Sequence, residues 1–318
     1  MVPKPSQKDT LRKLSGIGVR KQKITTRRKE LPMEIHRITM ADSSYPSSLR
    51  SIKDPPKELY FSGNIDLLES DCLAVVGARK ATAYGKWVAH SIAKRAAAHD
   101  IVVVSGMADG IDTAAHRGAI EGDGGTIAVL GCGIDICYPQ SNWDLWRKIA
   151  AQGLLLSEYS PGTPPMPFRF PLRNRIISGL SEVVVIAEAG LSSGSLITAE
   201  LAADQGRDVY AVPGNINATS SIGGNKLIRD GAIPVVVIDD VLEAMGILEK
   251  RKSGSKNSHL GNDEKILLRS ISQEGETTLD RLCKMTGKTA SEVNALVTIL
   301  EMKGELMTSM GKIFIAKY

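Results

Sequence analysis

The sequence has few aromatic residues and no long apolar run. Phenylalanine, tryptophan and tyrosine make up 4% of the 318 residues, and only four are phenylalanine. No run approaches the ~18 apolar residues that a membrane-spanning helix needs, and the N-terminus is basic without the apolar stretch of a signal peptide. We therefore expect a soluble cytoplasmic protein with no membrane partner.

Cysteine is also scarce, with four residues and no CxxC pair. Cys72, Cys132 and Cys283 have apolar or small neighbours, as reduced thiols in a protein core often do. Metal sites need denser ligand spacing, and the sequence offers no cluster of carboxylates and histidines of the kind a metal-dependent nuclease uses. The sequence predicts no metal and no cofactor.

The net charge of +5 is distributed unevenly. Residues 1–30 hold ten Lys or Arg and two acidic residues, a net charge of +8, which leaves −3 for the remaining chain. Cations beside phosphates release counterions, so a basic segment suits a polyanion partner. A solvated, disordered tail explains the charge equally well. We expect residues 1–40 to form a basic N-terminal tail that could be partly helical.

Residues 41–249 alternate short β-branched runs with helix-like segments. That rhythm predicts an α/β domain with a parallel sheet covered by helices on both faces, in which ligands bind beyond the carboxyl ends of the strands. The predicted strands span residues 72–77, 101–106, 126–131, 154–159, 183–189, 208–214 and 233–238, and the predicted helices span about 84–99, 112–121, 142–151, 195–205 and 225–230.

A second, smaller domain follows a linker. Residues 250–262 are polar and rich in Ser, Gly and Lys, as flexible linkers are. Within residues 263–318 the pattern predicts three helices and a hairpin, which together make a winged helix-turn-helix domain. Its eight basic and eight acidic residues cancel. We therefore expect protein contacts or packing there rather than duplex DNA binding.

Glycine-rich turns follow three of the predicted strands, each just before a predicted helix. Such turns can hold anions at the free amides of the helix N-terminus, although any one of them is also explained by ordinary helix capping. The first turn matches neither GxGxxG nor GxxxxGK[ST], which argues against a dinucleotide or a nucleoside triphosphate. The candidate residues are Arg79 in the first turn, Ser105 and Gly106 in the second, and Gly194 and Ser195 in the third.

Residues 161–175, PGTPPMPFRFPLRNR, contain five prolines, two phenylalanines, three arginines and no acidic residue. We expect an extended loop in which Phe168 and Phe170 stack on unpaired bases and the arginines meet phosphates. The alternative is a hydrophobic anchor that fixes the loop to the core, and we expect one of the two phenylalanines to serve that purpose. Asn174 and Arg175 run directly into an apolar segment, which favours a partly buried, structural position for both.

These motifs together resemble the DprA/Smf family, the DNA-processing proteins of bacterial natural transformation. The resemblance covers about residues 45–236 and includes VVGARKATAYG, SGMADGIDTAAH, FRFPLRNRIISGLSE and GLSSGSLITAELAADQG. It implies an extended Rossmann-like fold that forms a homodimer, binds and protects single-stranded DNA, and helps to load the RecA recombinase without catalysing a reaction. Many relatives carry a helical domain at the N-terminus, where this chain has about forty residues.

The resemblance also implies which residues contact DNA. They lie in the three glycine turns, in the aromatic and arginine-rich segment, and in the later motif GGNKLI. The positions are Arg79, Ser105, Gly106, Phe168, Arg169, Phe170, Arg173, Asn174, Gly194, Ser195, Asn225 and Lys226.

The alternative class is an enzyme, a nucleoside-monophosphate phosphoribohydrolase of the lysine-decarboxylase-like fold group. Glu200 follows a glycine-rich loop here and Arg175 precedes it, as such an enzyme would require. The characteristic PGGxGT run is absent, however, and the sequence offers no clear acid and base pair. His116 lies within a predicted helix, where a hydrogen-bonded structural role is the more common one. We therefore expect a binding protein.

Overall fold

The computed structural model describes residues 34–247, 261–274, 276–309 and 311–315. The predicted basic tail, apart from residues 34–40, and the predicted linker, apart from residues 261 and 262, lie outside the described residues. Among the helices described, none is long and apolar enough to cross a membrane.

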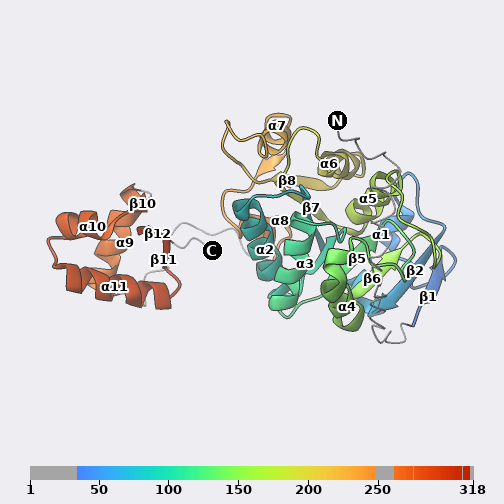
Figure 1. The fold of residues 1–318 in the computed structure, drawn as a ribbon, viewed down its shortest axis with the longest axis horizontal. Coiled ribbons are helices and arrows are strands. Elements are labelled where there is room, and N and C mark those ends of the chain that lie inside the picture. Colours follow the sequence, from blue (N-terminus) through green and yellow to red (C-terminus); the bar gives the residue numbers. More distant parts are fainter. Residues whose placement is uncertain (1–33, 248–260, 275, 310, 316–318) are drawn as a thin grey trace, which may run out of the picture. The chain divides into compact units, whose positions relative to one another are not determined.

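A nine-stranded sheet forms the centre of the larger described part (Figure 1). Its strand order is β1-β2-β6-β5-β4-β3-β7-β8-β9, and the seven strands from β6 to β9 are parallel. They correspond to the seven predicted strands. The sequence pattern missed β1 and β2, which pair antiparallel with each other, and β2 also pairs antiparallel with β6. The strands are β1 (His36–Thr39), β2 (Glu58–Gly63), β3 (Cys72–Gly77), β4 (Val102–Ser105), β5 (Thr126–Leu130), β6 (Leu154–Ser157), β7 (Val183–Glu188), β8 (Asp208–Ala211) and β9 (Ile233–Pro234).

Helices cover both faces of the sheet, as predicted. Alternate residues of a strand point to opposite faces, so Ala74 and Val76 belong to one apolar core while Leu73 and Val75 belong to the other. The first core is shared with α1 (Ser47–Arg50), α5 (Arg169–Leu180), α6 (Ser195–Asp204) and α7 (Ile222–Arg229), and the second with α2 (Ala83–Ala97), α3 (Ile111–Glu121) and α8 (Asp240–Ala244).

Three further segments complete the larger part. Helix α4 (Trp143–Gln152) packs against β2, β5, β6 and α3, and two 3₁₀ turns, η1 (Ile65–Glu69) and η2 (Gln140–Asn142), connect neighbouring elements.

The prediction of an extended loop through residue 175 is wrong, because helix α5 begins at Arg169. Four of the five prolines lie before the helix. Pro171 occupies its first turn, where a backbone N–H would have no partner within the helix, so the missing donor costs little. The segment therefore presents its side chains from a rigid helix rather than from a loop.

The strand order reverses at the middle of the sheet. From β3 the chain proceeds through β4, β5 and β6 on one side, and it then returns to place β7, β8 and β9 on the other. The loops after β3 and β7 consequently diverge and leave a crevice at their carboxyl ends, which is where open α/β sheets bind ligands.

The C-terminal part has its own apolar core, built from Leu267, Leu282, Val297 and their neighbours. As predicted, it contains three helices followed by a hairpin, and a short strand between the first two helices completes a three-stranded antiparallel sheet. Its elements are α9 (Asn262–Glu274), β10 (Glu276–Thr277), α10 (Leu279–Thr286), α11 (Ala290–Met302), β11 (Leu306–Ser309) and β12 (Lys312–Ile315).

Candidate nucleic-acid interface

A groove of about 850 Å³ opens at the point where the strand order reverses. The turn after β3 contributes Arg79 and Lys80 to it, both with exposed side chains. The opposite wall consists of the N-terminal half of α5 and the loop at residues 190–195, and residues 219–222 close one end. Ala108 of the second glycine turn also lines the groove, so residues from all three predicted turns meet the segment rich in phenylalanine and arginine.

The N-terminus of α2 differs from the prediction, because the protein fills it with its own carboxylate. Glu188 accepts a hydrogen bond from the Thr82 amide at 3.0 Å and another from the Thr82 hydroxyl, while that hydroxyl caps the helix by accepting from the Gly85 amide. A phosphate would have to displace a bound carboxylate there. The side chain of Arg79, rather than the helix N-terminus, is the group that this turn offers to an anion.

The second turn is buried and holds an internal charge. The Ser105 side chain is fully buried and its hydroxyl donates to the carbonyl of Val75, and Gly106 is buried as well. The carboxylate of Asp112 accepts from the Gly106 and Ala108 amides. The prediction that Ser105 and Gly106 touch DNA therefore does not fit their burial, and both residues support the groove from beneath.

Arg173 is buried too, although it was expected to meet phosphates. Its guanidinium donates to the carbonyls of Gly106 and Val129, and a Cβ on Gly106 would lie 2.6 Å from that guanidinium. Burial lowers the pKa of Arg173 to about 10, so the side chain remains cationic at neutral pH. Burial raises the pKa of Asp112 to about 6, against the opposing effect of the Arg173 charge. Arg173 thus supports the groove floor rather than its rim.

The third turn is the one that the protein does not fill with a carboxylate of its own. The Ser193 hydroxyl is 2.8 Å from the Ser195 hydroxyl and accepts a hydrogen bond from the Ser195 amide. The backbone carbonyl of Ser193 accepts another from the Leu196 amide. Gly194 is exposed, and a Cβ added to it would meet open space. Asn174 links this turn to α5, since its side chain donates to the Gly194 carbonyl at 3.3 Å.

Arginines and aromatic rings alternate along the start of α5. The Arg169 guanidinium lies 5.0 Å from the ring centre of Tyr159 and 5.5 Å from that of Phe168. Phe168 is 57% exposed. Such contacts hold a cation over ring faces while its edge stays available to an anion.

Phe170 is held more tightly than Phe168. Its half-buried ring stacks on Tyr138 with the ring centres 5.4 Å apart, and the Arg79 guanidinium lies 5.3 Å from its centre. The expectation that one phenylalanine anchors the segment fits Phe170, and the exposed ring of Phe168 fits stacking. Sequence reasoning missed Tyr138 and Tyr159, because nothing in their local pattern distinguishes a tyrosine that faces a distant phenylalanine or arginine.

The last two predicted contact residues lie on α7. The Asn225 side chain exchanges two hydrogen bonds with the backbone of Gly214, at 3.1 and 2.9 Å, and so fixes α7 to the loop after β8. Lys226 is exposed. It lines a second, shallower hollow of about 370 Å³, together with Leu191, Ile216, Ile222, Asn225 and Arg229. Leu191 and Ile222 also line the groove, so the two hollows adjoin.

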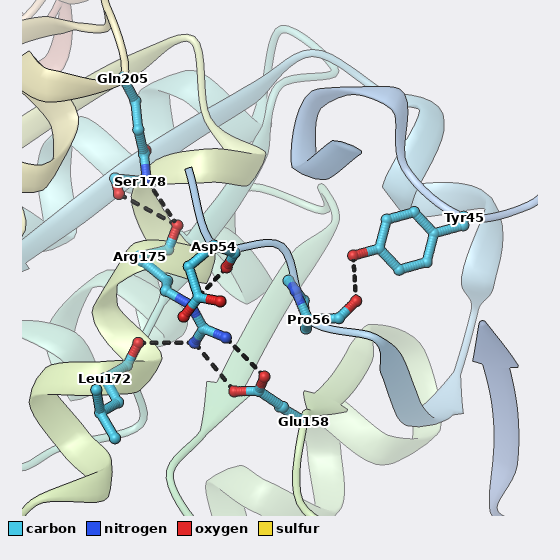
Figure 2. Close-up of polar contacts among 8 residues, drawn as sticks. All are labelled: Tyr45, Asp54, Pro56, Glu158, Leu172, Arg175, Ser178 and Gln205. Carbon is cyan, nitrogen blue, oxygen red and sulfur yellow. Dashed lines mark hydrogen bonds and ion pairs between the residues drawn. The ribbon is translucent and has the colours of Figure 1, made fainter. Parts of the chain in front are cut away.

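Arg175 is structural, as the sequence indicated (Figure 2). It forms two hydrogen bonds with Glu158, at 2.6 and 3.0 Å, and donates to the backbone carbonyls of Asp54 and Leu172, both at 2.8 Å. Neither Arg175 nor Glu200 lines the groove. The residues on which the hydrolase alternative depends are therefore not at the candidate site.

His116 is also structural. Its Nδ1 lies 2.8 Å from the Thr126 hydroxyl, which itself donates to the Val103 carbonyl at 2.7 Å. Nδ1 must therefore carry the proton and donate it. Burial, aided by the Arg173 charge, lowers the pKa of His116 to about 3. Within the part of the chain that the structure describes, no group of three or more His, Cys, Asp or Glu is placed to hold a metal ion.

Comparison with known proteins identifies relatives across most of the chain. The sequence model for DNA recombination-mediator protein A matches residues 36–246. The DNA processing protein DprA of Streptococcus pneumoniae is 47% identical over 207 residues, which is 64% of this chain and 72% of the relative. Protein Smf of Escherichia coli is 37% identical over 286 residues, which is 87% of this chain and 76% of the relative.

Two solved structures share the fold. DprA from Streptococcus pneumoniae superposes with a TM-score of 0.64 at 44% identity and covers 66% of this chain and 74% of that one. DNA processing protein A from Helicobacter pylori, whose structure addresses its single-stranded DNA binding mode, has a TM-score of 0.62 at 32% identity. The match covers 67% of this chain and 96% of that one. The chain belongs to the DprA/Smf family of DNA recombination-mediator proteins.

Proposed function

We propose that this protein is a recombination mediator that binds single-stranded DNA along the groove between β3 and β7. The observation that carries the proposal is the pairing of two exposed cations that line the groove, Arg79 and Lys80, with the exposed ring of Phe168, which directly follows the groove-lining Pro167. Cations attract any phosphate backbone, whereas an exposed ring selects unpaired bases because only they offer a free face. The relative from Helicobacter pylori, described by its single-stranded DNA binding mode, supports the same conclusion.

The structure narrows the set of residues that we propose to touch DNA. Arg79, Phe168, Arg169, Gly194 and Lys226 are assigned to contacts with the strand, because each lies in or beside the two adjoining hollows and none of them is buried. Ser195 is buried and is assigned to support of the third turn. We assign Ser105, Gly106, Arg173 and Asn225 to support of those hollows, and Phe170 and Asn174 to positioning of α5. The strand would then run from the start of α5, past the N-terminus of α6, to α7.

Replacing Phe168 tests this proposal. Base–aromatic stacking contributes about 1–3 kcal/mol per base, so Phe168→Ala should weaken single-strand binding roughly five- to 150-fold and leave duplex binding nearly unchanged. Fluorescence polarisation of labelled oligonucleotides over a range of salt concentrations measures both affinities. Leu172→Ala is the matched control, since it removes an exposed apolar side chain from the same helix without removing a ring.

The contrary result is equally clear. A Phe168→Ala protein with an unchanged melting temperature and an unchanged preference for single strands would remove stacking from the mechanism. A wild-type protein that bound duplex and single strands equally would overturn the proposed function itself.

We further propose that the protein acts in the cytoplasm as a homodimer that protects incoming DNA and helps to load RecA during natural transformation. The described surface offers apolar residues for a dimer contact at the edge of the sheet beside β9, where Ile233 and Val236 are exposed. The proposed organisation is a basic tail at residues 1–40, an extended Rossmann-like DNA-binding domain at 41–249, a linker at 250–262 and a winged-helix domain at 263–318.

The winged-helix proposal is supported by three helices and a three-stranded sheet in the expected order. Helix α11, which takes the position of a recognition helix, contains Glu292 and Glu301 and no Lys or Arg. Because phosphate contacts need cations, we propose that this domain contacts protein rather than duplex DNA.

We propose no catalytic step. The buried histidine and the Arg175 and Glu158 pair are engaged in structural hydrogen bonds, and Asp112 is held by two backbone amides. No free base from a nucleoside monophosphate should be released on incubation with the protein. Release of the free base, measured by chromatography, would instead favour the hydrolase alternative.

A further inference from the structure

Two exposed aromatic side chains lie side by side on α2, outside the groove. Tyr84 is 55% exposed and Trp87 is 41% exposed, and their ring centres are 6.3 Å apart with an interplanar angle of 27°. They are three residues apart on a helix and therefore occupy one face of it. In a chain with so few aromatic residues, an exposed stacked pair is a surface feature that the apolar core does not explain.

The packing of α2 against the core prevents the two rings from facing inward. Its opposite face carries Ala89, Ala93 and Ala96, which are buried in the core against the sheet. Gly85, between the two aromatic positions, packs so closely on Glu188 that a Cβ there would lie 2.6 Å from the carboxylate. The contact between Gly85 and Glu188 fixes the rotation of the helix at its first turn, so the two rings are held toward solvent.

The charge around the pair is positive. Lys86 is exposed beside the rings, and Lys80, which precedes them in the chain, lines the groove. Helix α2 contains no Asp or Glu. The carboxylate at its first turn, Glu188, is buried and bonded to Thr82, and Glu121 of α3 contacts His90 and Lys94 farther along the helix. Exposed cations therefore lie both in the groove and on the helix that carries the rings, and the carboxylate between them, Glu188, is buried.

We propose that Tyr84 and Trp87 form a second stacking platform, on which unpaired bases lie after the strand leaves the groove past Lys80. The inference rests on the proposed function and extends its binding path beyond the groove. A single-stranded nucleic acid is the occupant that fits, because its bases present flat faces to the rings while its phosphates meet Lys80 and Lys86. A duplex fits poorly, since its base faces are stacked within the helix and only its phosphates are accessible.

Trp87 supplies a built-in probe for this site. Of the three tryptophans, Trp146 is buried, Trp143 stacks on it, and Trp87 is the exposed one. Stacking of a base on Trp87 should quench its fluorescence. We expect no quenching with an oligo(dT) of about four nucleotides that fills only the groove, and progressive quenching as the length rises to about 30.

Substitutions distinguish the contribution of the two rings to binding from the use of Trp87 as a fluorescent probe. The variant Trp87→Phe should lose the length-dependent quenching and keep its affinity, because phenylalanine retains a stacking face. The double variant Tyr84→Ala/Trp87→Ala should bind long oligonucleotides about fivefold or more weakly and short ones normally, with an unchanged melting temperature. Lys148→Met on α4 serves as a surface control and should change neither measurement.

The outcomes distinguish this inference from the proposed function. If Phe168→Ala weakens single-strand binding while Trp87 stays unquenched at every length, the groove binds DNA and the second platform does not. Equal quenching by duplex and single strands would also overturn the platform. If polarisation detects no single-strand binding by the wild-type protein, the proposed function fails first, and this inference fails with it.

Discussion

Two arginines that look alike in the sequence have opposite environments in the structure. Arg79 is exposed at the rim of the groove, with Phe170 beneath its guanidinium. Arg173 is buried in the groove floor and compensates the buried carboxylate of Asp112. A surface cation contributes through phosphates, whereas removal of a buried cation leaves an uncompensated buried charge.

The matched substitutions Arg79→Met and Arg173→Met should therefore separate binding from stability. For single-strand binding by Arg79→Met, we expect the slope of the logarithm of the binding constant against the logarithm of the salt concentration to become less steep by about 0.7. The melting temperature should be unchanged. Arg173→Met should lower the free energy of unfolding by about 3–5 kcal/mol in urea titration at pH 7.5. If the two variants instead lost affinity alike and kept full stability, Arg173 would be a DNA contact after all.

His116 makes the stability of the fold depend on pH. Its pKa in the folded protein is about 3, below the ordinary value of 6.5, because Nε2 is buried and has no hydrogen-bond partner among the described residues. Between pH 6.5 and 3 the unfolded chain binds a proton at this position that the folded protein does not bind. Stability is therefore lost as the pH falls through that window. Asp112, whose pKa is raised to about 6, acts in the opposite direction between about pH 4 and 6.

A comparison with His116→Asn isolates the histidine contribution, because the asparagine amide can still donate to Thr126 and does not titrate. The stability of the wild type relative to this variant should fall by up to about 1.4 kcal/mol per pH unit below pH 6.5. Urea titrations of both proteins at pH 4.5, 5.5, 6.5 and 7.5 measure the difference, in which the other titrating groups cancel. A difference independent of pH would mean that His116 titrates alike in both states.

At the scale of the elements, regular patterns were predictable and long-range partners were not. The seven parallel strands are continuous apolar runs, since a central parallel strand is buried on both faces, and the pattern located all seven. Strand β2 was missed because its sequence, ELYFSG, mixes exposed and buried positions and follows a proline-rich stretch. The start of α5 was missed because prolines usually break helices, and only the position of Pro171 in the first turn makes it compatible with one.

The same distinction holds for the candidate site. The pattern of glycine turns predicted that Arg79, Gly194 and Ser195 share one edge of the sheet, and all three line the groove there. It could not reveal that Glu188 fills the N-terminus of α2, since that contact joins residues 106 positions apart. Nor could it reveal the burial of Ser105 and Arg173. Burial depends on what packs above a residue, and the chain segments that do so are far away in the sequence.

At the scale of the whole molecule, the proposed homodimer would need a contact surface outside the groove. The edge of the sheet at β9 has two exposed branched apolar residues, Ile233 and Val236, and Val236 is 79% exposed. Strand β9 is short and contains Pro234, which cannot donate to a partner strand, so addition of a further strand at this edge is disfavoured. The contact that we propose therefore depends on side chains rather than on backbone pairing.

Charges introduced into this surface should separate the protomers. Ile233→Glu and Val236→Glu would each place a carboxylate in a desolvated contact, which is costly without a partner cation. Sedimentation velocity at micromolar concentration should show a dimer for the wild type and a monomer for either variant, with unchanged melting temperatures. Ala151→Glu, an exposed position on α4, adds the same charge elsewhere and should leave the dimer intact. A wild type that sediments as a monomer, or variants that remain dimeric, would exclude this surface.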